Sequence, residues 1–125
     1  MSTLRAFIVE DNPVILNNLI ATLEELTDMR VVGSVGNEND AIRELSQRAP
    51  ELDLVIVDLF LTAGSGLGVL KSAQELKPPA RCVVLTNFAT PDMRRRCTAL
   101  GADQVFDKSS ELDELIDYCN RLAEA

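Results

Sequence analysis

Two hydrophobic patterns alternate along the chain: short runs of branched apolar residues, and longer stretches whose apolar residues recur every three or four positions. The short runs predict five strands, at 4–9, 31–35, 54–57, 82–85 and 104–106. The longer stretches predict five helices, at 13–26, 37–48, 67–76, 91–100 and 110–122. Strands that alternate with helices along the whole chain indicate an α/β domain, in which helices cover both faces of a parallel sheet.

Punctuating residues support these helix ends. Pro13 suits a first helical turn, and Ser110 with Asp113 could form a capping box for the last helix. The pair Pro78–Pro79 should stop the third helix, and Gly101 is the expected left-handed cap of the fourth. No linker or low-complexity stretch interrupts the alternation. We therefore expect residues 1–125 to form a single domain, with no second domain in this chain.

The composition is that of an ordinary soluble globular domain, with 46% apolar and 26% charged residues. The formal net charge of -8 argues against direct binding of nucleic acid by this chain, and suits a metal cation or a basic partner better. No histidine is present, which removes Ser-His-Asp triads and histidine zinc sites. Three cysteines suggest buried, reduced thiols, and no segment is apolar enough to span a membrane, so we expect a cytoplasmic protein.

Polar residues stand where four of the predicted strands end. They are Glu10 with Asp11, Asp58, Thr86 with Asn87, and Asp107 with Lys108. The carboxyl ends of parallel strands share one edge of a sheet, and ligands bind there in open α/β folds. Two carboxylates about 5 Å apart repel by roughly 3 kcal/mol at an effective dielectric near 20. Three of them together would need a cation, and oxygen ligands favour Mg²⁺ or a close relative such as Mn²⁺.

These positions, taken together, resemble the receiver domain of two-component response regulators. The resemblance runs from Leu4 to about Leu122, and includes Gly66, eight residues after Asp58, and Phe106, two residues before the lysine. It implies a flavodoxin-like (βα)5 fold with a five-stranded parallel sheet in the order 2-1-3-4-5. It also implies a phosphoacceptor signalling domain rather than an enzyme, one that catalyses only its own phosphorylation and dephosphorylation.

The resemblance assigns Asp58 as the nucleophile that accepts a phosphoryl group from the phosphohistidine of a histidine kinase or phosphotransfer protein. It implies that Asp11, Asp58, the carbonyl of Phe60 and Glu10 (through water) hold Mg²⁺ or Mn²⁺. Asp11 could instead simply cap the following helix, and Glu10 could be a solvated loop residue.

Three further residues complete the implied mechanism. Lys108 would neutralise a phosphoryl oxygen, Thr86 would be drawn towards the phosphoryl group, and Phe106 would move into the vacated space. The surface of the fourth helix, fifth strand and fifth helix would then change. Lys108 could instead be a surface charge paired with Asp107, Thr86 an ordinary strand residue and Phe106 plain core. Many receivers then dimerise, so Arg94–Arg96 could pair with Glu111, Asp113, Glu114 and Asp117 of a second copy.

The sequence also departs from the family pattern. Leu61 and Thr62 replace a usual methionine-proline pair, and Ser109 replaces the proline that commonly follows the lysine, which puts a cis peptide there in doubt. Asn87 stands where a small residue is usual and could narrow access to the site. Phe60 and Phe88 stand at positions that flank the path of the hydrolytic water.

Two rival functions remain open at this point. A degenerate receiver would be an interaction module that works without phosphoryl transfer. An aspartate-nucleophile phosphatase of the haloacid dehalogenase type would need a second aspartate two residues after the nucleophile, where this chain has Phe60.

Overall fold

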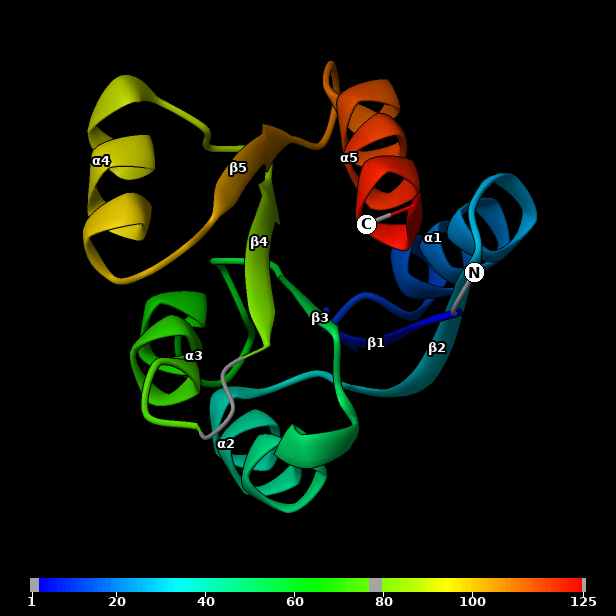
Figure 1. Ribbon diagram of the computed structural model, residues 1–125. Coiled ribbons are helices and arrows are strands. Elements are labelled where there is room, and N and C mark those ends of the chain that lie inside the picture. The colour runs from blue at the N-terminus through cyan, green and yellow to red at the C-terminus, as the bar shows by residue number, and fades with distance from the viewer. Residues whose placement is uncertain (1–2, 77–79, 125) are drawn as a thin grey trace.

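Five parallel strands form one sheet in the order β2-β1-β3-β4-β5 in the computed structural model, which describes residues 3–76 and 80–124 (Figure 1). The strands are β1 (Leu4–Val9), β2 (Met29–Val35), β3 (Leu54–Val57), β4 (Arg81–Thr86) and β5 (Gln104–Asp107). The helices are α1 (Pro13–Leu26), α2 (Glu38–Arg48), α3 (Gly66–Ala73), α4 (Pro91–Ala99) and α5 (Leu112–Glu124), with a 3-10 turn η1 (Ala49–Glu51). The predicted α/β class and strand order are confirmed.

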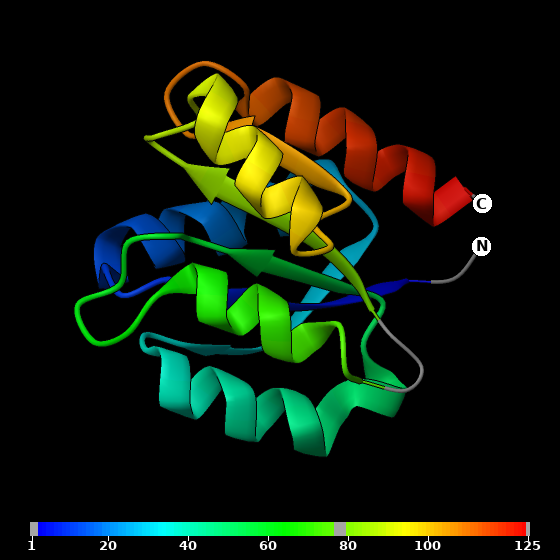
Figure 2. The same ribbon diagram turned by 90° about the vertical axis from the view of Figure 1, so that its left-hand side faces the viewer.

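The helices form two layers, one on each face of the sheet. Helices α2, α3 and α4 cover one face, and α1 and α5 cover the other (Figures 1 and 2). Successive side chains of a strand point to opposite faces, so Val55 and Val57 pack under α2 to α4, while Leu54 and Ile56 pack under α1 and α5. All four residues of β3 are buried for this reason. Truncating such a side chain to alanine costs about 2–5 kcal/mol.

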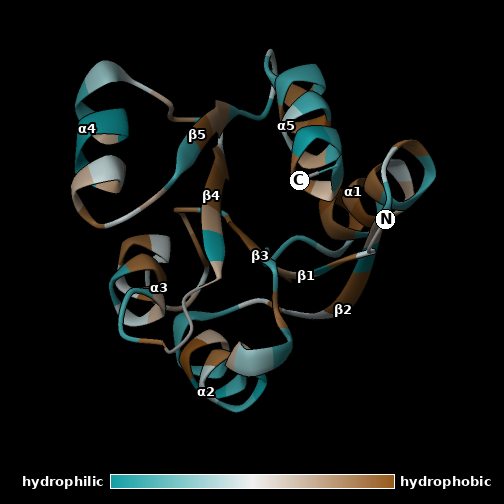
Figure 3. Cartoon of the chain, in the orientation of Figure 1, coloured by the Kyte–Doolittle hydropathy of each residue, from teal (hydrophilic) through white to brown (hydrophobic). Residues whose placement is uncertain are grey.

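The cartoon coloured by hydropathy shows hydrophobic and hydrophilic residues alternating along the turns of the helices (Figure 3). Leu19 and Leu23 of α1 and Leu115 and Cys119 of α5 are buried, as the helical spacing predicts. Leu26 continues the apolar spacing of α1 but is 52% exposed at the last turn, where the helix has passed the edge of the core.

The three cysteines are free thiols in the interior. Burial raises the pKa of Cys82 and of Cys119 to about 12 and also raises the pKa of Cys97. A thiol with a raised pKa is a poor nucleophile because the thiolate is scarce, so these residues act as small core side chains.

Two of the helix caps considered from the sequence need correction. Pro13 is the first residue of α1, as predicted, but the side chain of Asn12 accepts the N–H groups of Val14 and Ile15, so Asn12 rather than Asp11 caps this helix. The proposed capping box of Ser110 is wrong. Helix α5 begins at Leu112, and the N–H of Ser110 donates instead to the carboxylate of Asp107.

The predicted ends of the helices agree less well with the structure than the predicted ends of the strands. Helix α3 ends at Ala73, three residues before the predicted end, because Glu75 and Leu76 continue as tighter turns on Ser72 and Ala73. The predicted stop at Pro78–Pro79 lies outside the described residues. Gly101 has φ 102°, which confirms the left-handed cap after α4. Among the helices described, none is long and apolar enough to cross a membrane.

Candidate phosphoacceptor and metal site

The carboxyl ends of β1 and β3 carry three acidic side chains into one cluster. Glu10 and Asp58 directly follow these strands, and their N–H groups still bond to neighbouring strands: Glu10 N–H to the Val35 carbonyl at 3.0 Å and Asp58 N–H to the Val9 carbonyl at 2.9 Å. The sheet therefore fixes the backbone of both residues. One oxygen each of Glu10, Asp11 and Asp58 lies within 4.8 Å of the others.

Lys108 lies between two of these carboxylates. Its Nζ donates to Glu10 Oε1 at 2.5 Å and to Asp58 Oδ2 at 3.2 Å, and its side chain is only 13% exposed. The backbone N–H of Lys108 bonds to the Thr86 carbonyl at 2.9 Å, which extends the pairing of β4 with β5. Lys108 therefore pairs with the cluster and not with Asp107, whose carboxylate accepts N–H groups from the following turn.

Burial sets the electrostatics of the central carboxylate. Desolvation raises the pKa of Asp58, the nearby Lys108 ammonium opposes that rise, and the charge of Glu10 adds to it. Burial alone would lower the pKa of Lys108, but its hydrogen bond to Glu10 and the charge of Asp58 outweigh this, so its pKa is raised and it stays protonated. One ammonium faces three carboxylates, and the excess negative charge favours a bound cation.

Thr62 holds the third carboxylate. Its N–H donates to Asp11 Oδ2 at 2.6 Å, and its hydroxyl donates to the same oxygen. The hydroxyl is the main cause of a lowered Asp11 pKa. The donor set of the cluster, three hard carboxylate oxygens, fits Mg²⁺, Mn²⁺ or Ca²⁺ by charge and ligand type.

Gly66 begins α3 within contact distance of the loop that follows β3. A Cβ at this position would overlap the carbonyl of Asp58, and the Gly66 N–H donates to the Leu59 carbonyl at 2.9 Å. The glycine thus lets the helix start close to the backbone of the central aspartate.

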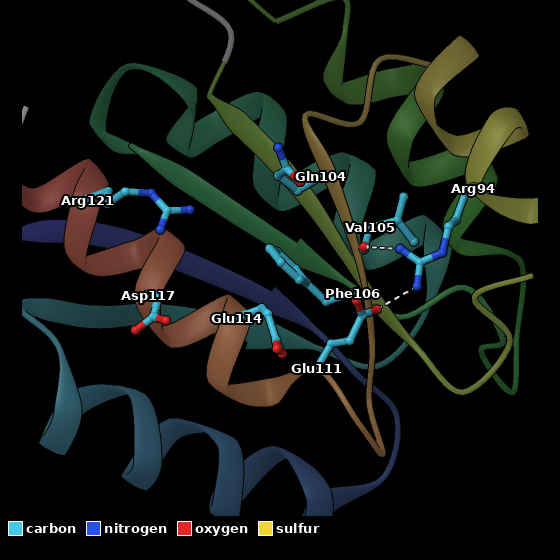
Figure 4. A pocket seen from close by; sticks show the side chains of 8 residues that line it. All are labelled: Arg94, Gln104, Val105, Phe106, Glu111, Glu114, Asp117 and Arg121. Atoms are coloured by element: carbon cyan, nitrogen blue, oxygen red, sulfur yellow. Dashed lines mark hydrogen bonds and ion pairs between the residues drawn. The ribbon is translucent and has the colours of Figure 1, made fainter. Parts of the chain in front are cut away.

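Thr86 and Phe106 lie on the paired strands β4 and β5, where Thr86 aligns with Asp107 and Phe106 aligns with Leu85. Thr86 is fully buried, and its Oγ1 accepts the Phe88 N–H at 3.1 Å. Phe106, which is 6% exposed, packs its ring against Tyr118 of α5 with the centroids 5.9 Å apart. It also lines a pocket of about 310 Å³ between α4, β5 and α5, drawn in Figure 4.

Two exposed phenylalanines and an asparagine border the site. Phe60 and Phe88 are 53% and 54% exposed, and their rings are in edge-to-face contact. Asn87 lines a second pocket of about 300 Å³, together with Lys108 and Ile15 of α1. Of the residues singled out from the sequence, the structure brings Glu10, Asp11, Asp58 and Lys108 together in one cluster.

Sequence reasoning missed the Thr62–Asp11 contact and also the contacts of Arg94. Arg94 was expected to face a second copy, but its guanidinium donates to the carbonyls of Ala89 at 3.0 Å and Val105 at 2.8 Å, and pairs with Glu111 at 2.5 Å (Figure 4). Glu111 Oε1 also accepts the Asp107 N–H at 2.9 Å. Three consecutive arginines in the sequence gave no signal that the first of them is bound within the chain.

A doubly covered parallel sheet with an acidic cluster and a lysine at its carboxyl edge defines an open α/β domain with a charged candidate ligand site at the strand ends. The profile of the response regulator receiver domain matches residues 6–120, and the chain belongs to this family. It is a receiver domain of two-component systems.

Individual relatives agree with that assignment. The chain is 31% identical over 114 residues, 91% of its length, to the uncharacterized transcriptional regulatory protein YvfU of Bacillus subtilis, of which the match covers 56%. The chain spans about half the length of the curated Bacillus subtilis relatives it matches.

Two solved structures have the same fold. One is the receiver domain of the putative response regulator NarL from Mycobacterium tuberculosis, with TM-score 0.85, 18% identity and coverage of 100% of this chain and 99% of that one. The other is a Burkholderia pseudomallei response regulator with a phosphorylated aspartic acid, a calcium ion and citrate. It has TM-score 0.78, 24% identity and coverage of 97% of this chain and 69% of that one.

Proposed function

We propose that Asp58 accepts a phosphoryl group from the phosphohistidine of a partner histidine kinase or phosphotransfer protein. One observation carries the proposal: the largely buried Asp58 carboxylate lies against Lys108 Nζ and within 4.8 Å of two further carboxylates, at the edge where such folds bind ligands. The phosphorylated aspartate of the Burkholderia pseudomallei relative supports the same chemistry.

In the proposed step, an oxygen of Asp58 attacks phosphorus as the P–N bond to the partner's imidazole breaks. An acyl phosphate forms on Asp58, and the released imidazole nitrogen keeps the electron pair of the broken bond. Lys108 is already placed 3.2 Å from Asp58 Oδ2 and neutralises part of the charge on the phosphoryl oxygens. Positioning and charge stabilisation supply most of the rate in such transfers.

Asp11, Asp58 and the carbonyl of Phe60 would hold Mg²⁺ or Mn²⁺ directly. Glu10 would act through water, because its Oε1 is bound to Lys108 and its Oε2 to the Asn12 N–H. When bound, the cation supplies charge screening between the carboxylates and the incoming phosphoryl oxygens.

Phosphorylation would then change the face formed by α4, β5 and α5. The Thr86 hydroxyl, which now accepts the Phe88 N–H, would turn to a phosphoryl oxygen, and the buried ring of Phe106 on the neighbouring strand would repack. This is a population shift between two states, driven by the contacts that only the phosphorylated form makes. A phosphorylation-dependent homodimer through this face is the proposed readout. The net charge of -8 argues against direct contact of this chain with nucleic acid.

The test is intact-mass analysis after incubation with a small phosphodonor and Mg²⁺. We expect one added phosphoryl group that is stable in acid and labile in alkali, and that is absent from Asp58→Asn. Asp107→Asn is the matched control: this aspartate ends β5 on the same edge, but its carboxylate accepts the N–H groups of Ser109 and Ser110.

Labelling that persists in Asp58→Asn would refute the assignment. A wild type that takes up no phosphoryl group would favour an interaction module that works without phosphorylation, and steady release of phosphate from phosphomonoesters would favour a phosphatase.

A further inference from the structure

The loop between β3 and α3 is tied to the acidic cluster through one residue. Thr62 lies 51 positions from Asp11 in the sequence, yet both of its donors, N–H and hydroxyl, bind Asp11 Oδ2. The proline expected here from the resemblance could supply neither donor, since it lacks both an N–H and a hydroxyl. The contact is therefore a feature of this chain's own sequence.

The other end of the same loop is fixed independently. Glu38 at the start of α2 donates its N–H to the Ala63 carbonyl at 3.1 Å, and its carboxylate accepts the Ser65 N–H at 2.7 Å. Ser65 in turn caps α3 by accepting the Leu67 N–H. Gly64, at φ 88°, lies so close to Glu38 that a Cβ would overlap that side chain. These contacts hold the loop, so Thr62 meets Asp11 from a fixed position.

We infer that Thr62 is a positioning residue for the cation at this site: it orients the Asp11 carboxylate through Oδ2 and leaves Oδ1 for the metal. The inference rests on the metal part of the proposed function and adds a residue to it. A carboxylate held by hydrogen bonds on one oxygen loses less rotational freedom when the other oxygen binds a cation. Removing such a supporting partner typically weakens metal affinity by about 10–100-fold.

The opposite role, competition of Thr62 with the metal for Asp11, predicts the opposite sign. A competing donor would have to be displaced, so its removal would tighten binding. Both Thr62 donors reach one oxygen, and a carboxylate can accept hydrogen bonds on one oxygen while it binds a cation through the other. The geometry therefore favours support over competition.

The experiment is isothermal titration of the unphosphorylated protein with MgCl₂ at constant ionic strength. Thr62→Val removes the hydroxyl and keeps the backbone N–H, so we expect Kd to rise about tenfold, at the low end of the range for such partners. Thr62→Ser restores the hydroxyl and should bind within about twofold of wild type. Thr27→Val is the matched control, because the Thr27 hydroxyl donates to the Leu23 carbonyl at the opposite end of α1.

Several outcomes would overturn the inference. Equal or tighter binding by Thr62→Val would show that the hydroxyl is neutral or competes with the metal. Weakening in Thr62→Ser or Thr27→Val equal to that in Thr62→Val would show a general loss of structure. A wild type that takes up no Mg²⁺ would overturn both this inference and the metal part of the proposed function. If the wild type binds Mg²⁺ and Thr62→Val binds it equally well, only this inference is overturned, and the metal part of the proposed function stands.

Discussion

The ring of Phe60 meets the ring of Phe88 edge to face, with centroids 4.5 Å apart and an angle of 61° between the planes. Phe60 follows Asp58 by two residues, and Phe88 follows Thr86 by two, so the contact joins the loops after β3 and β4 at the edge that carries Asp58. Such a pair contributes about 0.5–1.5 kcal/mol beyond the area it buries. It therefore holds two apolar groups together at positions that the family resemblance predicts to border the approach of a hydrolytic water.

This ring pair predicts a long-lived acyl phosphate. Water must attack in line, opposite the Asp58 oxygen, and neither ring can hold or orient it. Phe60→Asn combined with Phe88→Glu supplies polar groups and opens the pair, so we expect phosphoryl loss to speed up about 10–100-fold, which is 1.4–2.7 kcal/mol of barrier. The measurement is the decay of phosphorylated protein after removal of the phosphodonor.

Leu26→Asn is the control for this change, since Leu26 is also about half exposed but lies at the far end of α1. Its phosphoprotein should decay like wild type. A lifetime that is unchanged or longer in the double variant would show that the rings do not shield the phosphoryl group, while Asp58 would keep its role.

Crowded carboxylates predict that the metal-free protein is strained. Asp58→Asn removes one repelling charge, and Lys108 keeps its 2.5 Å contact with Glu10, so no ammonium is left unpaired. We expect the melting temperature without metal to rise by about 4 °C, which corresponds to roughly 1 kcal/mol for a domain of this size. Mg²⁺ should stabilise the wild type as RT ln(1 + [L]/Kd) and the variant much less.

Lys108→Met is the opposing control, because it leaves three carboxylates without their ammonium. It should destabilise the metal-free protein by about 3–5 kcal/mol, as expected when one partner of a buried pair is lost. Thermal melts with and without Mg²⁺ test both variants. Repulsion within the cluster would be ruled out if Mg²⁺ left the melting temperature of the wild type unchanged and Asp58→Asn melted at the same temperature as the wild type.

The fold was predictable because it follows from local pattern. A short run of branched apolar residues such as Leu54–Val57 favours a strand covered on both faces, and a polar residue directly after it is then expected at the edge of the sheet. The positions of Asp58 and Lys108 followed from that geometry. The capping residues of the helices were harder to predict. Whether Asp11 or Asn12 caps α1 depends on which side chain the loop turns towards the free N–H groups of the first turn.

Contacts between distant loops were not predictable from pattern. Nothing in the sequence around Thr62 indicates that its donors reach Asp11, because the approach depends on how Glu38 holds the same loop. Arg94 shows the same limit. Its neighbours Arg95 and Arg96 are exposed, and only the packing of α4 against β5 brings its guanidinium to the Val105 carbonyl.

The Arg94–Glu111 pair predicts a specific pH dependence of stability. The pKa of Glu111 lies below its ordinary value of 4.5, mainly because of its hydrogen bond to Arg94 and next because of the Asp107 N–H. A depressed pKa gives stability that is present above the unfolded-state pKa and is lost as pH falls through the lower folded-state pKa. Glu111→Gln should therefore lose less stability than wild type between about pH 5 and 3, by about 0.3–1 kcal/mol for a pair one-third exposed.

Melting curves across this pH range provide the measurement. Glu75→Gln, in the exposed turn after α3, is the matched control and should follow the wild-type curve. Parallel pH profiles for wild type and Glu111→Gln would contradict the assignment of this ion pair.

The proposed homodimer depends on which arginines of α4 are exposed. Arg94 pairs with Glu111 of its own chain, and Arg95 pairs with Asp92 on the exposed face of α4. Arg95 and Arg96 are both exposed, so they are the arginines that could meet acidic residues of α5 on a second copy. Three acidic residues of α5 remain for that role: Asp113, Glu114 and Asp117. Arg95→Glu with Arg96→Glu should therefore abolish phosphodonor-dependent dimerisation in sedimentation velocity, and added salt should weaken the wild-type dimer, because exposed charges are screened within about 8 Å at 0.15 M. Arg30→Glu with Lys71→Glu makes the same change of charge at exposed positions on β2 and α3, and should still dimerise. Loss of the dimer in both double variants would make net charge the cause, and a strictly monomeric phosphorylated wild type would rule out pairing through this face.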